Sequence, residues 1–355
     1  MNFRIFKQVP KLIFGINSIK RINELLPLKS SKEYFVYVID DYFDKNFYVN
    51  NNLNVSQNDH LIFFPATKKE PSTNQIDYYR DEIIKKYSNH LPKAIIGIGG
   101  GSTMDVAKSI SVMLCNIGSS SEYQGWDLPK NKGIYKIGVP TIAGSGSEAS
   151  RTAVLMGNDR KFGINSDFSM FDAIILDSNL IDTVPTDQRF YSGMDCYIHC
   201  VESSEGTMIN ELSKSIASQA LSLCSKVFVE NGTNDMLITA SYLGGVSIVN
   251  SEVGICHALS YGLSLELDFR HGFANCVVFN HLEEYYGEHV LKFKQMLIDH
   301  NINLPKNVTK KLSDEAIERM IDMTLKMERP LTNALGEKWS EIMTRKKIRE
   351  LYMMM

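Results

Sequence analysis

Two side chains near the middle of the sequence, Asp195 and His199, are the first candidates for chemistry. They lie four residues apart in a stretch of helical periodicity, so on a helix they share one face on consecutive turns. A carboxylate and an imidazole placed in this way could bind one metal ion. The same spacing is also common in surface hydrogen bonds and helix salt bridges, so the pair alone does not establish a metal site.

Two of the eight histidines add support to this interpretation. His257 and His271 lie fourteen residues apart in apolar, helix-like surroundings, and Gly272 follows the second one. Neutral imidazoles in such surroundings need polar partners. One carboxylate with three imidazoles suits Fe²⁺ or Zn²⁺ better than Mg²⁺ or Ca²⁺, which prefer oxygen ligands. The four side chains are therefore candidate ligands of one divalent ion.

A glycine-rich segment in the first half is a candidate phosphate site. An apolar run from Ala94 leads into Gly99-Gly100-Gly101 and then into a helical pattern. Backbone N–H groups and the helix dipole at such a helix start suit a pyrophosphate. The third glycine of the usual dinucleotide fingerprint is replaced by Ser102, so a simple strand-to-helix turn is an equal alternative.

A second loop and an acidic pair extend the candidate nucleotide site. Residues 139–150 again follow an apolar run and are rich in glycine and hydroxyl groups, so the two loops could face one ligand from neighbouring strand ends. Asp40 and Asp41 end an earlier strand pattern. A carboxylate there can bind an adenosine ribose and repel a 2′-phosphate, which favours NAD over NADP. An acidic turn is the alternative, and the pattern does not say which Asp would bind the ribose.

The elements that must position these residues differ between the two halves of the chain. The first half alternates short apolar runs with amphipathic stretches, which predicts a parallel sheet with covering helices. Strands are expected at residues 34–39, 94–98, 134–139 and 173–176, and a helix at 104–114. The second half shows helical periodicity without strand patterns, over residues 187–229 and 237–249 and in a tail divided by Pro330 and Gly336.

These patterns predict two domains, with a boundary near residue 186. The first, residues 1–186, is an α/β NAD-binding domain, and the second, residues 187–355, is an all-α domain for metal and substrate. The composition of 44% hydrophobic and 22% charged residues is that of a globular protein. A net charge of -3 argues against nucleic-acid binding.

The sequence also bears on where the protein works. Polar residues interrupt both the N-terminus and the most apolar region, residues 237–267, so we expect neither an export segment nor a membrane span. The six cysteines form no CxxC pair, which is typical of buried thiols in a reducing compartment. We therefore expect a cytoplasmic protein.

Taken together in their order along the chain, these motifs resemble the iron-dependent (type III) alcohol dehydrogenases. The resemblance covers nearly the whole sequence and implies an N-terminal dinucleotide-binding domain, a C-terminal helical domain, a cleft between them where the metal meets the nicotinamide, and a homodimer. The motifs that carry it are Phe14-Gly15, Gly99 to Lys108, Pro140 to Glu148, Gly193 to His199, and His257 to Asn275.

Carried over residue by residue, the resemblance assigns roles to named positions. It implies NAD and one Fe²⁺ or Zn²⁺ ion as cofactors, with Asp195, His199, His257 and His271 as metal ligands. The expected cofactor-binding residues are Asp40, Asp41, Gly99, Gly100, Gly101, Ser102, Asp105, Thr141, Ser145, Ser147 and Lys161. The ion would act as a Lewis acid on a substrate hydroxyl while hydride passes to the nicotinamide.

Two positions depart from the family pattern and point to the substrate. Tyr261 stands where many members have a second histidine, and Arg270 stands where many have proline before the last ligand. Arg270, or less favourably Arg151, could pair with a substrate carboxylate, with a surface salt bridge as the alternative. Tyr261 could bind a sugar hydroxyl or take part in proton release.

The narrower resemblance is to 3-deoxy-octulosonate 8-oxidases, judged on residues 3–15, the Asp40-Asp41 pair and residues 334–345. It implies oxidation of the C8 hydroxyl of an acidic sugar to an aldehyde. Three alternatives stay open. They are a dehydrogenase of small alcohols or diols, a metal- and NAD-dependent cyclase of the dehydroquinate synthase type, and a non-catalytic nucleotide-binding scaffold.

Overall fold

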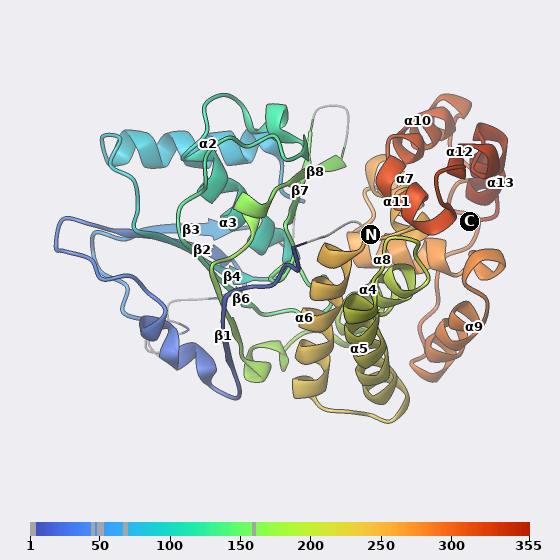
Figure 1. Cartoon of the computed structure of the whole chain (residues 1–355), viewed down its shortest axis with the longest axis horizontal. Helices are drawn as coiled ribbons and strands as arrows, with labels where there is room; N and C mark the ends of the chain where they lie inside the picture. The colour runs from blue at the N-terminus through green and yellow to red at the C-terminus, as the bar shows by residue number, and fades with distance from the viewer. Residues whose placement is uncertain (1–4, 44–46, 48–52, 67–69, 158–160) are drawn as a thin grey trace. The chain divides into compact units, whose positions relative to one another are not determined.

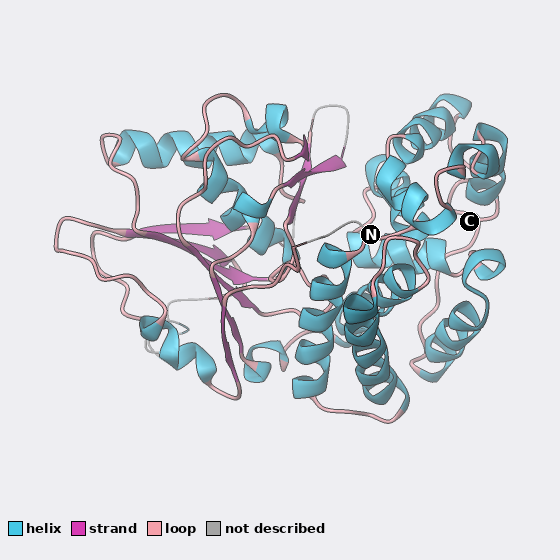
Figure 2. Cartoon of the chain, viewed as in Figure 1, coloured by secondary structure: helices cyan, strands magenta, loops and turns pink. Residues whose placement is uncertain are grey.

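The structure is a computed structural model that describes residues 5–43, 47, 53–66, 70–157 and 161–355. Its contacts divide the chain into a unit of strands and helices and a unit of helices (Figure 2). The first comprises Gln8–Ile142 and Ser147–Thr183, and the second comprises Val184–Met355 together with Ala143–Gly146 and residues 5–7. The predicted boundary at residue 186 assigned both short segments to the α/β domain, whereas in the structure they group with the helices. Residues 3 and 4 of the opening motif lie outside the described residues.

The α/β unit is built on a parallel sheet of six strands, in the order β1-β9-β6-β4-β2-β3 (Figure 1). Its strands are β1 Lys11–Phe14, β2 Phe35–Asp40, β3 His60–Phe64, β4 Ala94–Gly99, β6 Lys136–Pro140 and β9 Ala173–Leu176. A smaller sheet joins β5 Gly125–Trp126, β8 Lys161–Asn165 and β7 Thr152–Met156. Helices of this unit within the described residues include α2 Thr73–Lys86 and α3 Gly101–Met113. The predicted strands correspond to β2, β4, β6 and β9, whereas β1, β3 and the small sheet were not predicted.

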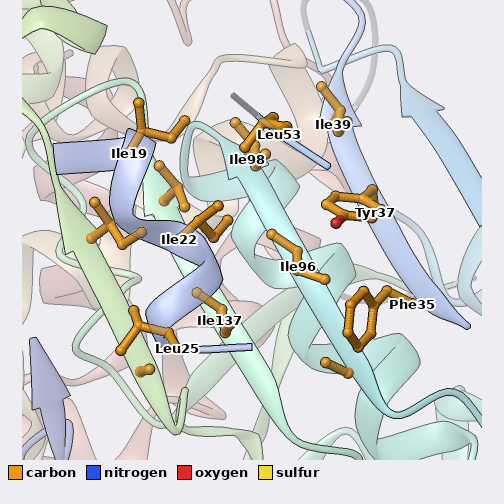
Figure 3. Close-up of a cluster of buried hydrophobic side chains, with 14 of the residues drawn as sticks. Ile19, Ile22, Leu25, Phe35, Tyr37, Ile39, Leu53, Ile96, Ile98 and Ile137 are labelled. Carbon is orange, nitrogen blue, oxygen red and sulfur yellow. The ribbon is translucent and has the colours of Figure 1, made fainter. Parts of the chain in front are cut away.

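The core of this unit explains why its central strands read as continuous apolar runs. Every residue of β2, β4, β6 and β9 is buried, as expected for parallel strands covered on both faces. On one face, alternate strand residues such as Tyr37 and Ile96 form one buried cluster with Ile19 and Ile22 of the 3-10 helix η1, Ser18–Glu24 (Figure 3). On the other, a Cβ at Gly97 would lie only 2.8 Å from the Ala107 Cβ of α3, so glycine there permits close helix packing.

The second unit consists of helices, which confirms the predicted fold class of an α/β domain with an all-α partner. They are α4 Thr186–Ser204, α5 Glu211–Val229, α6 Asn234–Asn250, α7 Ile255–Leu267, α8 His271–Phe279, α9 Glu283–Asp299, α10 Asp314–Leu325, α11 Glu328–Leu335, α12 Trp339–Ile342 and α13 Arg345–Met353. Side chains of Asn210, Thr233 and Ser313 cap α5, α6 and α10 by accepting backbone N–H bonds.

One helix boundary differs from the prediction for a physical reason. Pro330 was expected to separate two helices, but it is the third residue of α11. A proline is tolerated in the first turn, because the N–H it lacks has no intrahelical acceptor there. The expected apolar region at 237–267 is divided between α6 and α7. In the described part of the chain, every helix is too short or too polar to cross a membrane.

Candidate metal centre and nucleotide site

Three helices of the helical unit bring the four candidate ligands together. Asp195 and His199 lie on consecutive turns of α4, as their spacing predicts. His257 lies in the first turn of α7, and His271 is the first residue of α8. Between them the chain reverses at Asp268, whose φ of 54° is left-handed and ends α7. The fourteen-residue spacing therefore corresponds to one helix and the turn that follows it.

The distances within this cluster fit a single metal ion. The Asp195 Oδ1 atom lies 3.7 Å from His199 Nε2, 3.5 Å from His257 Nε2 and 3.6 Å from His271 Nε2. Ligand atoms each about 2.1 Å from a tetrahedral ion would be about 3.4 Å apart. Among the described residues, this is the group of side chains whose ligand atoms could hold a metal, all within 4.8 Å of one another. The four residues therefore fit a divalent ion.

The four candidate ligands differ in how far they are exposed to solvent. Asp195, His199 and His257 are almost fully buried, whereas the His271 side chain keeps 28% of its surface exposed. Catalytic metal sites leave one coordination position for substrate, whereas structural sites are closed. The exposed edge at His271 is therefore the side from which a small molecule could approach an ion.

The electrostatics of the cluster suit a cation. Burial alone would raise the pKa of Asp195, but the neighbouring histidines hold it well below its ordinary value. Burial lowers the pKa of His199 to about 4, so its imidazole is neutral near pH 7. Burial would also lower the pKa of His257, but Glu202 and Asp195 outweigh it and raise this pKa to about 9. The carboxylates of Asp195 and Glu202 thus lie on either side of the His257 ring, where they would also attract a cation.

Two further polar side chains complete the cluster and were missed by the sequence analysis. Glu202 accepts a hydrogen bond from His257 Nδ1 at 2.5 Å, and the Asn275 amide nitrogen lies 2.6 Å from Asp195 Oδ1. That nitrogen is also 3.1 Å from His257 Nε2 and 3.3 Å from His271 Nε2. Their spacing was a usable signal, because Glu202 lies one turn after His199 on α4 and Asn275 lies one turn after His271 on α8.

The candidate substrate residues lie beside the ligand His271. The Tyr261 ring is buried, and its centroid lies 5.8 Å from that of His271. Arg270 is exposed and immediately precedes α8. Arg151 does not fit the substrate role, because it is buried in the α/β unit and pairs with Asp127 and, at 2.8 Å, with Asp167.

The first glycine loop has the geometry expected of a phosphate site. Gly99 ends β4 and Gly100 is the N-cap of α3, with no side chain capping that helix. The N–H groups of Gly101 and Ser102 are among the first-turn donors that have no intrahelical acceptor. A Cβ at Gly99, whose φ is +159°, would lie 2.5 Å from Thr103 Oγ1. The Thr141 backbone N–H donates to the Gly99 carbonyl at 2.9 Å and so joins the second loop to the first.

Two of the expected cofactor contacts bind each other. Asp105 accepts hydrogen bonds from Ser147 Oγ at 2.7 Å and from the Val154 N–H at 3.0 Å, and it lies 3.2 Å from the buried Lys108 ammonium. These contacts connect α3 to the second loop. They favour a role for Asp105 and Ser147 in holding the loops, and their contact with a cofactor stays a prediction.

The remaining expected cofactor contacts are dispersed. Asp40 is buried and accepts from the Tyr42 N–H at 3.1 Å, whereas Asp41 is exposed. Lys161 begins β8 and lies 3.7 Å from Glu70. Ser145 lies in the segment Ala143–Gly146, which groups with the helices and not with the first glycine loop.

A parallel α/β sheet with a glycine loop, joined in one chain to a helical unit with an Asp/His cluster suited to a metal ion, is typical of a class of enzymes that use a nucleotide cofactor and a metal ion. Family models agree with this class. Residues 10–178 match the iron-containing alcohol dehydrogenase model, and residues 189–351 match the model of the C-terminal domain of the same family. The chain belongs to the iron-containing alcohol dehydrogenase family.

Individual relatives agree with the family. The sulfoacetaldehyde reductase of Bilophila wadsworthia is 31% identical over 75% of this chain and 70% of its own length. Among solved structures, a 1,3-propanediol oxidoreductase superposes with a TM-score of 0.83 at 20% identity, covering 99% of both chains. A sulfoacetaldehyde reductase of Bifidobacterium kashiwanohense in complex with NAD⁺ gives 0.78 at 19% identity, covering 99% of this chain and 98% of its own.

Family membership carries the cofactors with it. Proteins of this family use NAD and an iron or other divalent ion, and the chain has an Asp/His cluster suited to the metal. Its members are oxidoreductases that act on alcohols and aldehydes. The expectation of an NAD- and metal-dependent dehydrogenase is therefore confirmed, and the substrate is the open question.

Proposed function

We propose that this protein interconverts a small primary alcohol and its aldehyde, with NAD and one Fe²⁺ or Zn²⁺ ion held by Asp195, His199, His257 and His271. The observation that carries the proposal is the cluster of one carboxylate and three imidazoles, with an exposed edge at His271 alone. When bound, the ion supplies Lewis acidity that lowers the pKa of a substrate hydroxyl.

The chain's own residues then have separate tasks. Asp195 offsets part of the cation's charge, and the backbone N–H groups at the start of α3 bind the pyrophosphate. Asp41, exposed at the end of β2, accepts hydrogen bonds from the adenosine ribose, while Asp40 closes the turn through Tyr42. The phenol of Tyr261, next to His271, orients the substrate by a hydrogen bond to its hydroxyl, or relays the hydroxyl proton by accepting it while donating its own proton onward to water.

For the substrate, we infer a short alcohol or aldehyde that carries an acidic group. Arg270 is exposed directly beside the ligand His271, where a guanidinium can bind a carboxylate or sulfonate. The relative that is 31% identical is named for sulfoacetaldehyde, a two-carbon sulfonate. The relatives support small substrates better than the expected eight-carbon sugar acid, so 3-deoxy-octulosonate serves as the competing substrate in the test.

The proposal predicts that NADH at 340 nm is formed or consumed with small substrates, and faster with acidic ones. Protein loaded with Fe²⁺ or Zn²⁺ is assayed with propanol, 1,3-propanediol, 2-hydroxyethanesulfonate, sulfoacetaldehyde and 3-deoxy-octulosonate. Arg270→Ala should raise KM for the sulfonates by about tenfold or more and leave KM for propanol unchanged. Arg319→Ala, at an exposed arginine that pairs with Glu266, is the control. If 3-deoxy-octulosonate were turned over faster than the small substrates, the choice of substrate would be overturned. If a substrate were converted with no net change in NADH, the protein would instead be a cyclase.

We also propose that two copies of the chain associate through the edge strand β1. Within the described residues, β1 pairs with β9 on one side. Leu12 and Phe14 on β1 are 39% and 50% exposed, and Ile16, two residues beyond its end, is 63% exposed. An edge strand with exposed apolar side chains favours pairing with another chain.

Sedimentation should therefore give a dimer, and Phe14→Asp should shift it toward monomer. Phe63→Asp is the matched control, because Phe63 is 44% exposed on the opposite edge strand β3. Equal behaviour of the two variants would contradict pairing through β1.

We further propose that the protein works in the cytoplasm, because all six cysteines, which lie in the described part of the chain, carry free thiols.

A further inference from the structure

We propose that Glu202 positions the ring of His257 for the metal ion, and that Asn333 holds the backbone around Glu202 in place. This inference rests on the proposed metal site. Neither residue reaches the ligand atoms of the cluster itself, so both act through their neighbours. The evidence is a continuous set of buried hydrogen bonds that runs from α11 through the end of α4 to the first turn of α7.

The carboxylate of Glu202 is held by three donors. Oε2 accepts from His257 Nδ1 at 2.5 Å, while Oε1 accepts from the Cys256 N–H at 2.6 Å and from the Tyr286 hydroxyl at 3.2 Å. Glu202 is only 1% exposed. A buried carboxylate is costly unless hydrogen bonds compensate it, and here both oxygens are satisfied from α7 and α9. The orientation of the carboxylate is therefore fixed from two helices.

The consequence for His257 is a defined ring orientation. Because Glu202 accepts at Nδ1, that nitrogen carries a proton, and Nε2 is the nitrogen that faces the cluster, 3.5 Å from Asp195 Oδ1. Metal-bound histidines commonly donate their second ring N–H to a carboxylate, which fixes the ring and makes it a stronger ligand. Glu202 thus prepares the Nε2 lone pair of His257 for the ion.

Asn333 ties together the backbone on both sides of this contact. Its amide nitrogen lies 3.4 Å from the Glu202 carbonyl, 3.0 Å from that of Glu252 and 3.1 Å from that of Val253, and its oxygen accepts from the Met208 N–H at 2.9 Å. Asn333 is fully buried. It therefore joins the end of α4 to the segment that leads into α7. The side chain of Glu202 bridges the same two segments.

The direct test is Glu202→Gln, measured by equilibrium competition for Zn²⁺ against a chromophoric chelator, with no substrate present. A glutamine has one acceptor oxygen, so at one of the two carboxylate positions its NH₂ group would face a donor. We expect the Zn²⁺ dissociation constant to rise about 10- to 100-fold. Glu205→Gln is the matched control, because Glu205 is the next exposed glutamate beyond α4 and pairs with His289 at the surface. It should change the constant less than about twofold.

A spectrum separates positioning from a general effect on folding. With Co²⁺ in place of Zn²⁺, the visible absorption reports the ligand geometry, and Glu202→Gln should shift it while the circular dichroism of the metal-free protein is unchanged. If Glu202→Gln does not fold, Tyr286→Phe removes one donor to Glu202 without touching His257, and should weaken Zn²⁺ binding about two- to tenfold.

If Glu202→Gln folds and its Zn²⁺ affinity and Co²⁺ spectrum are unchanged, the proposed role of Glu202 is wrong. If Glu202→Gln does not fold, an unchanged Zn²⁺ affinity in Tyr286→Phe has the same meaning. These outcomes differ from a failure of the proposed function. If the unmodified chain binds Zn²⁺ tightly but turns over no alcohol or aldehyde, the function is wrong and the positioning role stands. If it binds no metal ion, both are wrong.

Discussion

Asp195→Asn is expected to abolish ion binding and to lower kcat/KM by at least about a thousandfold. Asp195 is the one carboxylate in the cluster, and its Oδ1 atom lies within 3.7 Å of all three imidazole Nε2 atoms. The substitution removes the only negative charge that a buried divalent ion would meet among its four ligands. It nearly preserves side-chain volume, so the loss reports charge and ligation and not packing.

Metal content per chain and NADH formation are the two measurements for this variant. Asp187→Asn provides the control, because Asp187 is an exposed aspartate in the first turn of the same helix. It should retain the ion and its activity. If Asp195→Asn keeps a full equivalent of tightly bound metal, the four-residue site is incorrect.

Gly144→Ala is expected to destabilise the protein by about 3 to 5 kcal/mol, because a steric clash adds to backbone strain. A Cβ at Gly144 would lie 1.9 Å from the Ser192 carbonyl oxygen, and its φ is +151°. The obstacle is backbone of α4, three residues before Asp195, and cannot rotate away. The Gly144 N–H also donates to Ser241 Oγ of α6 at 2.8 Å. We therefore expect weaker metal binding as well as lower stability.

Urea unfolding of the metal-free protein measures this effect, and Gly15→Ala isolates its cause. Gly15 has a similar φ of +135°, but nothing in the described part of the chain lies within 4 Å of the place that a Cβ would take there. It should therefore show the cost of backbone strain alone, about 1 to 3 kcal/mol. Equal losses in the two variants would mean that packing against α4 contributes nothing at Gly144.

Much of the fold was predictable because periodicity is a local property. The buried strands β2, β4, β6 and β9 are apolar on both faces and were recognised, and so was the helical second half. Strand β1 is mostly exposed on both faces, so it shows neither a continuous apolar run nor a clear alternation. The small sheet is equally weak in pattern, since β5 has only two residues.

The candidate site, like the fold, could be predicted only in part from the sequence. Local spacing placed Asp195 and His199 on one face of α4, and the order of motifs matched one family and its cofactors. The relatives described above do not show the narrower match to an octulosonate oxidase, because substrate contacts depend on a few side chains that the family motifs do not specify. Substitutions at Arg270 and Tyr261 are therefore the experiments that test which substrate the protein uses.

What the sequence determined by itself is therefore the set of ligand types and the elements that carry them. Only the tertiary structure decided that Glu202 meets His257 across 55 residues and that Asn275 meets Asp195 across 80. It likewise grouped Ala143–Gly146 with the helices, although that segment follows a strand. The physical reason is that spacing fixes which face of a helix a residue occupies, whereas packing between helices fixes which faces meet.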